Sequence, residues 1–156
     1  MLLSNLIKNT NSKYKKIFVK GIAFDSKKVK KKDIFFAIEG NKTSGVKYIN
    51  DALSKGASAI IINKKTKYRN HKIPLIVVSD PRKSLAEACS KFYKKKPKNI
   101  IAVTGTNGKS SVSDFYYQIL KINNVSVGSI GTLGIKFKNK LISLNNTTLD
   151  SLNLSK

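Results

Sequence analysis

Short apolar runs and stripes of apolar residues at helical spacing alternate along the first part of the chain. Runs at 17–24, 33–38, 59–62 and 73–78 combine isoleucine, valine and phenylalanine, a pattern typical of buried strands. The first run is broken by a glycine, and we expect it to form a strand pair or one bent strand. Strands that alternate with helices predict a compact α/β domain.

Helical spacing predicts three helices among these strands. Residues 2–7 place their leucines and isoleucine on one face, and residues 48–55 form a second amphipathic segment that ends before Gly56, where glycine commonly terminates a helix. A third helix begins with Asp80 as N-cap and Pro81 in its first turn. Its inward face is predicted to carry Leu85, Ala86, Ala88, Cys89, Phe92 and Tyr93.

A polar, proline-bearing segment at 94–99 predicts a domain boundary. We therefore expect one domain over residues 1–96 and a second over 97–156. The second begins with an apolar run at 100–103, predicted as a strand, and a helix over 109–122 follows a glycine-containing loop. This helix is expected to pack inward through Val112, Phe115, Tyr116, Ile119 and Leu120.

The remaining residues predict a strand, a hairpin and the start of a helix. Residues 125–130 have the pattern of a strand, and 149–154 have that of the first turns of a helix. Residues 135–137 and 141–144 flank Asn139 as strands flank the tip of a β-hairpin. A nucleotide-binding α/β domain usually needs roughly five parallel strands covered on both faces. We therefore expect the second domain to be incomplete.

The strongest chemical signal is the loop before the 109–122 helix, Thr104-Gly105-Thr106-Asn107-Gly108-Lys109-Ser110-Ser111. Backbone N–H groups at a helix N-terminus and the positive end of the helix dipole favour a polyphosphate. Lys109 adds a point charge, and the Ser110 hydroxyl can bind Mg²⁺. Val103 stands where the full phosphate-loop pattern has its first glycine, so an ordinary strand-to-helix turn stays open as the alternative.

Two polar segments of the first domain allow more than one interpretation. Asp25 and Ser26 follow the first predicted strand, where such residues often satisfy the local backbone. Residues 39–45 form a loop with two glycines whose free N–H groups can bind an anion, although a solvated loop explains the pattern equally well. His71 lies in a charged loop at 63–72 without a partner cluster, so it predicts neither metal binding nor catalysis.

The formal net charge of +23 over 156 residues raises the question of nucleic-acid binding. Only Arg69 and Arg82 are arginines, whereas base readout and phosphate forks favour arginine. The lysines are scattered, and asparagine and isoleucine are abundant as well, which indicates compositional drift. We expect no nucleic-acid partner, and a basic nucleic-acid-binding module remains the alternative from another functional class.

Cysteine content and the lengths of the apolar runs favour the cytoplasm. The one cysteine, Cys89, cannot form an intrachain disulfide and lies in a helical pattern, as a small core residue does. No apolar run approaches the roughly 20 residues of a membrane helix. The first residues lack the basic n-region of a signal peptide. These features predict a cytoplasmic protein without a membrane partner.

The phosphate loop resembles that of the Mur ligases, the ATP-dependent amide-forming enzymes of peptidoglycan synthesis. Upstream, the chain is similar to the N-terminal substrate domain of these enzymes at 21–29, 33–40, 56–60 and 80–86. Downstream, it resembles the members that add the third residue, diaminopimelate or lysine, to UDP-N-acetylmuramoyl-L-alanyl-D-glutamate, at 128–134 and 146–150. The resemblance covers nearly the whole chain, and the ordered set of motifs is specific.

The resemblance implies a small N-terminal α/β substrate domain followed by the beginning of a P-loop parallel-sheet ATPase domain. It also implies UDP-N-acetylmuramoyl-dipeptide and a diamino acid as substrates, with ATP and Mg²⁺. In this family the substrate carboxylate is phosphorylated to an acyl phosphate, which the incoming amine attacks. Positioning and charge neutralisation do most of that work. We expect a monomer.

Individual roles follow from the same resemblance. Phe24 and Ser26 match positions that contact the uridine. The loop that holds the diphosphate corresponds to Asn41, Lys42 and Thr43, and the loop that binds the muramoyl-peptide side corresponds to Asn146, Thr147 and Thr148. The ATP loop corresponds to Gly105, Thr106, Asn107, Gly108, Lys109, Ser110 and Ser111. Within it, Lys109 is the catalytic candidate that neutralises the β/γ-phosphates, and Ser110 is the Mg²⁺ ligand.

The chain departs from the family pattern in three ways. Ser110 and Ser111 replace the commoner pair of threonines, which keeps the hydroxyl, and Leu149 replaces a usual proline. The family's central domain also continues past the matched region with a carboxylate metal ligand and a modified lysine, and a C-terminal domain carries the amino-acid site. The resemblance therefore implies that this chain alone does not complete the ligation.

Two related enzymes are alternatives to this interpretation. The neighbouring ligase that adds D-alanyl-D-alanine shares the N-terminal layout, but its phosphate loop more often has serines before Gly-Lys, and it fits Thr147 and Thr148 less well. Folylpolyglutamate synthetase usually has glycine where this chain has Ser110, and it lacks such an N-terminal domain. A truncated, non-functional product is a further possibility. The sequence leaves the choice between diaminopimelate and lysine open.

Overall fold

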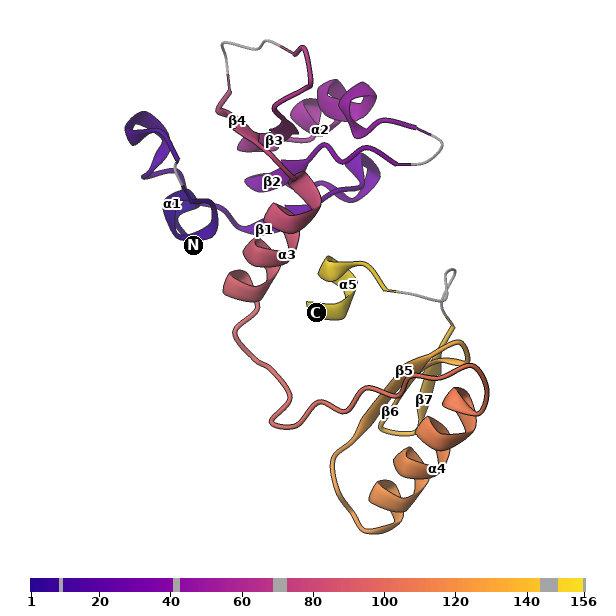
Figure 1. Ribbon diagram of the computed structural model, residues 1–156. Helices are drawn as coiled ribbons and strands as arrows, with labels where there is room; N and C mark the ends of the chain where they lie inside the picture. Colours follow the sequence, from indigo (N-terminus) through magenta and orange to yellow (C-terminus); the bar gives the residue numbers. More distant parts are fainter. Residues whose placement is uncertain (9, 41–42, 69–72, 144–148, 156) are drawn as a thin grey trace. The chain divides into compact units, whose positions relative to one another are not determined.

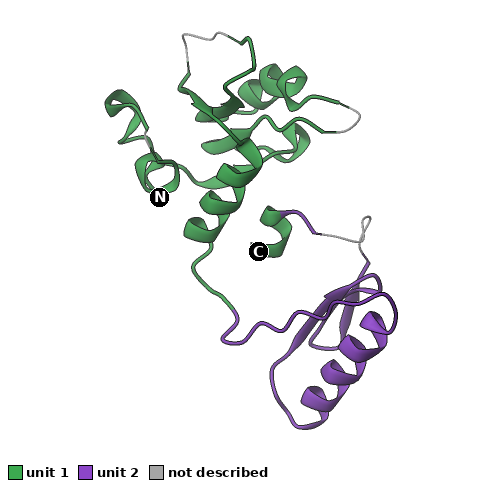
Figure 2. Cartoon of the chain, in the orientation of Figure 1, with its two compact units in different colours: residues 1–96, 151–156 green, residues 97–150 purple. Residues whose placement is uncertain are grey.

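The computed structural model describes residues 1–8, 10–40, 43–68, 73–143 and 149–155 (Figure 1). The chain divides into two compact units (Figure 2). Unit 1 consists of Met1–Lys96 with Ser151–Lys156, and unit 2 consists of Pro97–Asp150. The assignment of a substrate role to residues 1–96 and a nucleotide role to 97–156 stays a prediction.

Unit 1 is built on a four-stranded parallel sheet. Its strands, in sheet order, are β1 (Gly21–Ala23), β2 (Asp33–Phe36), β3 (Ala59–Asn63) and β4 (Leu75–Val78). Each strand lies within or beside a predicted apolar run, and most are shorter than the run. The first run is bent, because only its end joins the sheet while Phe18 forms an isolated bridge to Leu2.

Helices flank this sheet, and two of them end or begin at the capping residues that the sequence predicts. They are α1 (Leu3–Leu6), α2 (Ile49–Ser54), α3 (Pro81–Phe92) and α5 (Ser151–Ser155), and the short 3₁₀ segments are η1 (Ser12–Tyr14), η2 (Ser26–Lys28) and η3 (Gly45–Tyr48). The carboxylate of Asp80 caps α3 by accepting from the backbone N–H of Arg82 at 2.8 Å and of Lys83 at 3.1 Å. Gly56 follows α2 with φ of +88°, as predicted for a C-terminal glycine.

The core of unit 1 has two layers, because successive strand residues face opposite sides of the sheet. Ile34 and Phe36 point to one layer and Phe35 to the other. The first layer includes residues of α1, α3 and α5, and the second includes residues of α2 with the half-buried Val46 of η3. Cys89 is fully buried in the first layer, as predicted. Ala86, predicted to face inward, is exposed, so the inward stripe of α3 is narrower than predicted.

Unit 2 combines one long helix with a small antiparallel sheet. Helix α4 (Lys109–Ile122) precedes strands β5 (Gly128–Gly131), β6 (Gly134–Phe137) and β7 (Lys140–Ile142), which pair in that order. The predicted hairpin with Asn139 at its tip is confirmed. Lys138 and Asn139 have φ values of 46° and 62°, the left-handed pair that a two-residue hairpin turn requires.

Two predictions for unit 2 are wrong. Residues 100–103 form no strand, and Ile100 is 80% exposed, because an isolated run has no neighbouring strand to pair with. The apolar face of α4 is also exposed rather than packed inward, with Phe115 at 63%. The exposed residues of that face are Val112, Phe115, Tyr116, Ile119 and Ile122, while Leu120 is half-buried.

The opposite face of α4 meets the sheet through hydroxyl and carboxylate side chains. The apolar face is exposed because no further layer among the described residues covers it. Tyr117 is the one apolar side chain buried within the part of unit 2 that the structure describes. The mixed α/β class is confirmed, with its parallel sheet in unit 1. Across the described ranges, no helix combines the length and apolar character needed to cross a bilayer.

Candidate functional site

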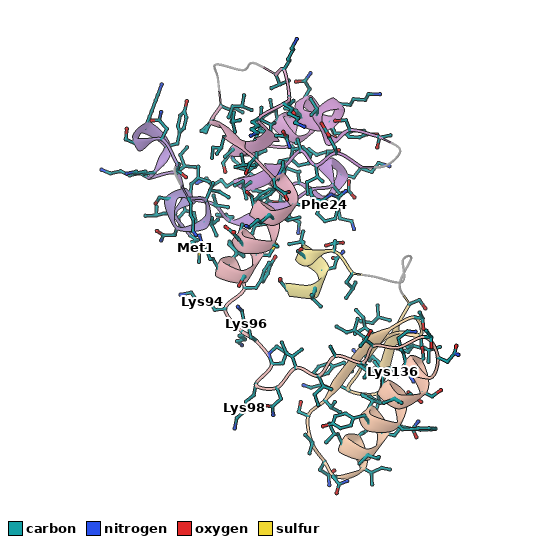
Figure 3. All side chains as sticks on the ribbon, in the orientation of Figure 1. Met1, Phe24, Lys94, Lys96, Lys98 and Lys136 are labelled. Atoms are coloured by element: carbon teal, nitrogen blue, oxygen red, sulfur yellow. The ribbon has the colours of Figure 1, made fainter. Side chains whose placement is uncertain are left out.

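The predicted nucleotide-sugar residues of unit 1 share one edge of the parallel sheet. Carboxyl ends of parallel strands meet at the same edge, where α/β sheets bind ligands. Phe24 and Ser26 follow β1, and the 39–45 loop follows β2. The first turn of α3 follows β4 at that edge. Phe24 is half-buried, packs against the first core layer and lies near α3 (Figure 3).

Ser26 is held in a polar network and is only 5% exposed. Its carbonyl accepts a 3.0 Å hydrogen bond from the Lys55 ammonium, which also pairs with Asp51 at 2.8 Å. The hydrogen bond from Lys55, and after it one from Ser26, lowers the pKa of Asp51. The segment after β1 is therefore fixed from α2, and the Ser26 side chain is engaged within the unit.

The 39–45 loop has a rigid base. Glu39 and Ser44 form an isolated bridge, and the Gly40 N–H donates to the Thr43 carbonyl at 2.9 Å. A Cβ on Gly45 would lie 2.6 Å from the Ile38 carbonyl oxygen, so only glycine fits there. Thr43 is exposed, as a ligand contact requires. Asn41 and Lys42 lie outside the described residues.

Arg82 joins this loop to α3 and was absent from the predicted site. Its guanidinium donates to the Glu39 carbonyl at 2.9 Å. It also lines a cavity of about 200 Å³ formed by Ile38, Glu39, Asn63, Asp80, Pro81 and Arg82. The available signal was its rarity, because Arg82 is one of only two arginines in a lysine-rich chain.

The phosphate loop of unit 2 has the backbone that its glycines predict. Gly108 is the N-cap of α4 with φ of +75°, and Gly105 has φ of +150°. An added Cβ at Gly108 would meet no atom within 4 Å, so its backbone conformation, not space, selects glycine. All residues from 104 to 111 are exposed. Thr106, Asn107 and Ser111 therefore stay open to a ligand.

Lys109 and Ser110 begin α4 at this loop. The Lys109 ammonium donates to the carbonyls of Gly105 and Thr106, the latter at 2.9 Å, so it lies over the loop. The Ser110 hydroxyl lies 3.1 Å from that of Thr132, in the turn between β5 and β6. A helix N-terminus, an adjacent ammonium and an exposed hydroxyl fit the phosphates of a nucleotide and its Mg²⁺.

A polar interface joins α4 to the hairpin. Asp114 accepts from Lys136 of β6 and from Gln118 at 2.7 Å, and Figure 3 shows Lys136 on the hairpin beside α4. The hydrogen bond from Lys136, followed by that from Gln118, lowers the pKa of Asp114. Ser113 and Ser129 share a 2.9 Å hydroxyl contact in the same interface.

Some predicted positions have no structural account. Asn146, Thr147 and Thr148 lie outside the described residues, and so does His71. Among the residues that are described, no group of three or more histidine, cysteine, aspartate or glutamate side chains could hold a metal ion. The assignment of Ser110 as a metal ligand stays a prediction.

Two family models match nearly the whole chain. Residues 18–93 match the Mur ligase family, catalytic domain, and residues 103–156 match the Mur ligase middle domain. The chain belongs to the Mur ligase family.

The relatives that match most of the chain carry one enzyme name. It is 46% identical over 142 residues to the UDP-N-acetylmuramoyl-L-alanyl-D-glutamate--2,6-diaminopimelate ligase of Rickettsia conorii, a match that covers 88% of this chain. The same match covers 29% of the relative, so the chain spans less than a third of the length of that enzyme.

Solved structures agree with this assignment. A structure of a UDP-N-acetylmuramoyl-L-alanyl-D-glutamate--2,6-diaminopimelate ligase matches 99% of this chain and 32% of its own length, with a TM-score of 0.76 and 25% identity. The MurF ligase from Thermotoga maritima, solved in complex with ADP, matches 69% of this chain and 24% of its own, with a TM-score of 0.55 and 29% identity. The diaminopimelate branch thus accounts for more of the chain.

Proposed function

We propose that this chain is the N-terminal portion of an ATP-dependent ligase that adds meso-diaminopimelate to UDP-N-acetylmuramoyl-L-alanyl-D-glutamate in the cytoplasm. The observation that carries the proposal is the order of two features along the chain. Unit 1 has a parallel-sheet edge that bears loops, and a phosphate loop at the start of α4 follows it in the sequence, as the matches to the two family models do. The name of the 46% identical Rickettsia relative supports diaminopimelate over lysine and over D-alanyl-D-alanine.

Unit 1 supplies the nucleotide-sugar site in this proposal. Phe24 offers an apolar surface at the sheet edge, and the backbone around Ser26 is fixed by Lys55. Thr43, at the base of the 39–45 loop, contacts the diphosphate in this proposal, and the family resemblance assigns Asn41 and Lys42 the same role. Lysine and free backbone N–H groups are suited to this anion. The family resemblance assigns Asn146, Thr147 and Thr148 to the muramoyl-peptide side of the substrate.

Unit 2 supplies one half of the nucleotide site. Bound ATP would supply the phosphoryl group that activates the substrate carboxylate, and Mg²⁺ would neutralise charge on its phosphates. The exposed loop from Gly105 to Ser111 would hold the phosphates through its N–H groups. Lys109 would leave the two loop carbonyls and neutralise phosphate charge, and the Ser110 hydroxyl would bind Mg²⁺.

Binding of UDP-N-acetylmuramoyl-L-alanyl-D-glutamate to the 156-residue chain tests the proposal. Titration calorimetry at physiological salt is expected to show a one-to-one complex. Added salt is expected to weaken this complex only modestly, because part of the recognition is uncharged. Phe24→Ala is expected to weaken binding, whereas Phe18→Ala, which changes a half-exposed phenylalanine before β1, is expected to leave it unchanged.

Single-stranded DNA separates this function from the alternative of another class. A chain of net charge +23 is expected to bind DNA weakly by charge alone, with an affinity that collapses as salt rises. Salt-resistant DNA binding together with no detectable nucleotide-sugar binding would overturn the proposal in favour of a nucleic-acid-binding module.

A further inference from the structure

A hydroxyl pair connects the phosphate loop to the β5–β6 turn. Ser110 is the second residue of α4, and its Oγ lies 3.1 Å from Oγ1 of Thr132. Thr132 occupies the two-residue turn between the paired residues Gly131 and Gly134. A turn this short leaves its residues little freedom, so Thr132 is presented to the loop by the hairpin.

The chemistry of this contact matters if Ser110 binds a cation. A serine hydroxyl has one proton and two lone pairs. When a lone pair of Ser110 faces a metal ion, its proton must point elsewhere, and Oγ1 of Thr132 is placed to accept it. Thr132 then has its own proton free to donate to a neighbouring oxygen. The contact therefore fixes the rotation of the Ser110 hydroxyl.

A second hydroxyl pair on the same two elements provides a contrast. Ser113 and Ser129 lie 2.9 Å apart, about one helical turn from the Ser110 contact. Both of these serines are half-buried between α4 and β5, whereas Ser110 and Thr132 are exposed beside the loop. The inner pair joins the helix to the strand, whereas the outer pair lies beside the proposed phosphate site.

We propose that Thr132 is a positioning residue for the metal-binding hydroxyl of Ser110. The inference rests on the proposed nucleotide site and adds to it a residue that was absent from the predicted set. Thr132 acts through Ser110. Its loss is expected to weaken the contribution of Mg²⁺ to nucleotide binding while leaving metal-free nucleotide binding unchanged.

The test measures two dissociation constants for each variant of the 156-residue chain, one for ATP with Mg²⁺ and one for ATP with a chelator. Backbone amide shifts of Gly108 and Ser111 in NMR titrations report both constants, even for weak binding. The dissociation constant with the chelator divided by that with Mg²⁺ gives the contribution of the metal. Thr132→Val, which removes the hydroxyl and keeps the shape, is expected to lower this ratio about three- to tenfold, the effect of one hydrogen bond.

Two control variants make the result specific. Thr132→Ser restores the hydroxyl and is expected to recover the ratio, whereas Ser129→Ala removes the inner contact and is expected to leave it unchanged. Amide shifts of β5 and β6 without ligand show whether each variant keeps the hairpin. An unchanged ratio in Thr132→Val, or an equal loss in Ser129→Ala, would overturn the inference.

Ser110→Ala separates the two levels of the argument. Failure of the inference alone appears as a ratio that falls in Ser110→Ala but stays unchanged in Thr132→Val. Failure of the proposed nucleotide site appears as no magnesium-dependent binding in the unsubstituted chain, or a ratio insensitive to Ser110→Ala, and it overturns the inference as well.

Discussion

The two units of this chain use apolar residues in opposite ways. In unit 1, Phe35 and Phe36 are fully buried, and helices cover both faces of the parallel sheet. In unit 2, the apolar face of α4 is exposed, and polar contacts join the helix to the hairpin. Unit 1 therefore has a core of its own, whereas the apolar face of α4 in unit 2 has no layer covering it among the described residues.

The largest effect expected from this difference concerns turnover. With ATP, Mg²⁺, UDP-N-acetylmuramoyl-L-alanyl-D-glutamate and meso-diaminopimelate, the chain alone is expected to release no phosphate above background, because unit 2 holds only part of a nucleotide site. A coupled phosphate-release assay measures this, with the full-length Rickettsia conorii relative as positive control. Stoichiometric phosphate and tripeptide product from the chain alone would show that unit 2 is already complete.

A pair of phenylalanine substitutions tests the comparison on stability. Phe35→Ala is expected to lower the free energy of unfolding of unit 1 by about 3–5 kcal/mol, because it opens a cavity in a fully buried site. Phe115→Ala on α4 is expected to change stability by no more than about 0.5 kcal/mol, because that ring is 63% exposed. Urea denaturation followed by amide NMR signals from each unit measures both. Equal losses would contradict the contrast between the units.

The cap of α3 gives a smaller effect within unit 1. Asp80→Ala is expected to cost about 1 kcal/mol, because two backbone N–H groups lose their acceptor. Asp80→Asn keeps an acceptor and is expected to recover most of the loss. Thermal unfolding of both variants is the measurement, and a full loss in the asparagine variant would show that charge, not capping, is responsible.

The smallest effect is a pH dependence in unit 2. Because Lys136 lowers the pKa of Asp114, the contact stabilises the interface of α4 and β6 above the unfolded carboxyl value of about 3.9. This stabilisation is lost as pH falls through the lowered pKa of the folded state. NMR titration of the two side chains follows it. Asp114→Asn is expected to abolish the transition, and an undisturbed contact at the lowest pH would contradict the assignment.

The sequence predicted unit 1 well because its patterns and its contacts are local to that unit. Helix ends are marked by the local chemistry of Asp80, Pro81 and Gly56. The isoleucine-rich runs pair with one another as parallel strands. Ala86 shows the limit of this reasoning, because a small apolar residue at the margin of a stripe packs inward only where a neighbour reaches it.

Unit 2 was predicted less well because the formation of a strand and the burial of a helix face both require a neighbouring element. The run at 100–103 has strand composition, yet pairing decides whether it becomes a strand. The apolar stripe of α4 was correctly recognised, but its burial needs a layer that the described residues do not supply. Arg82 and Thr132 were missed because their importance lies in contacts to distant residues, Glu39 and Ser110, which no local pattern encodes.

Hydrogen exchange of the chain with and without UDP-N-acetylmuramoyl-L-alanyl-D-glutamate tests the central claim most directly. If unit 1 is a formed substrate site, added protection is expected at amides after β1 and β2, including Lys27, Gly40 and Thr43, while α4 keeps its rate. Protection confined to unit 2, or none at a saturating concentration, would contradict the account.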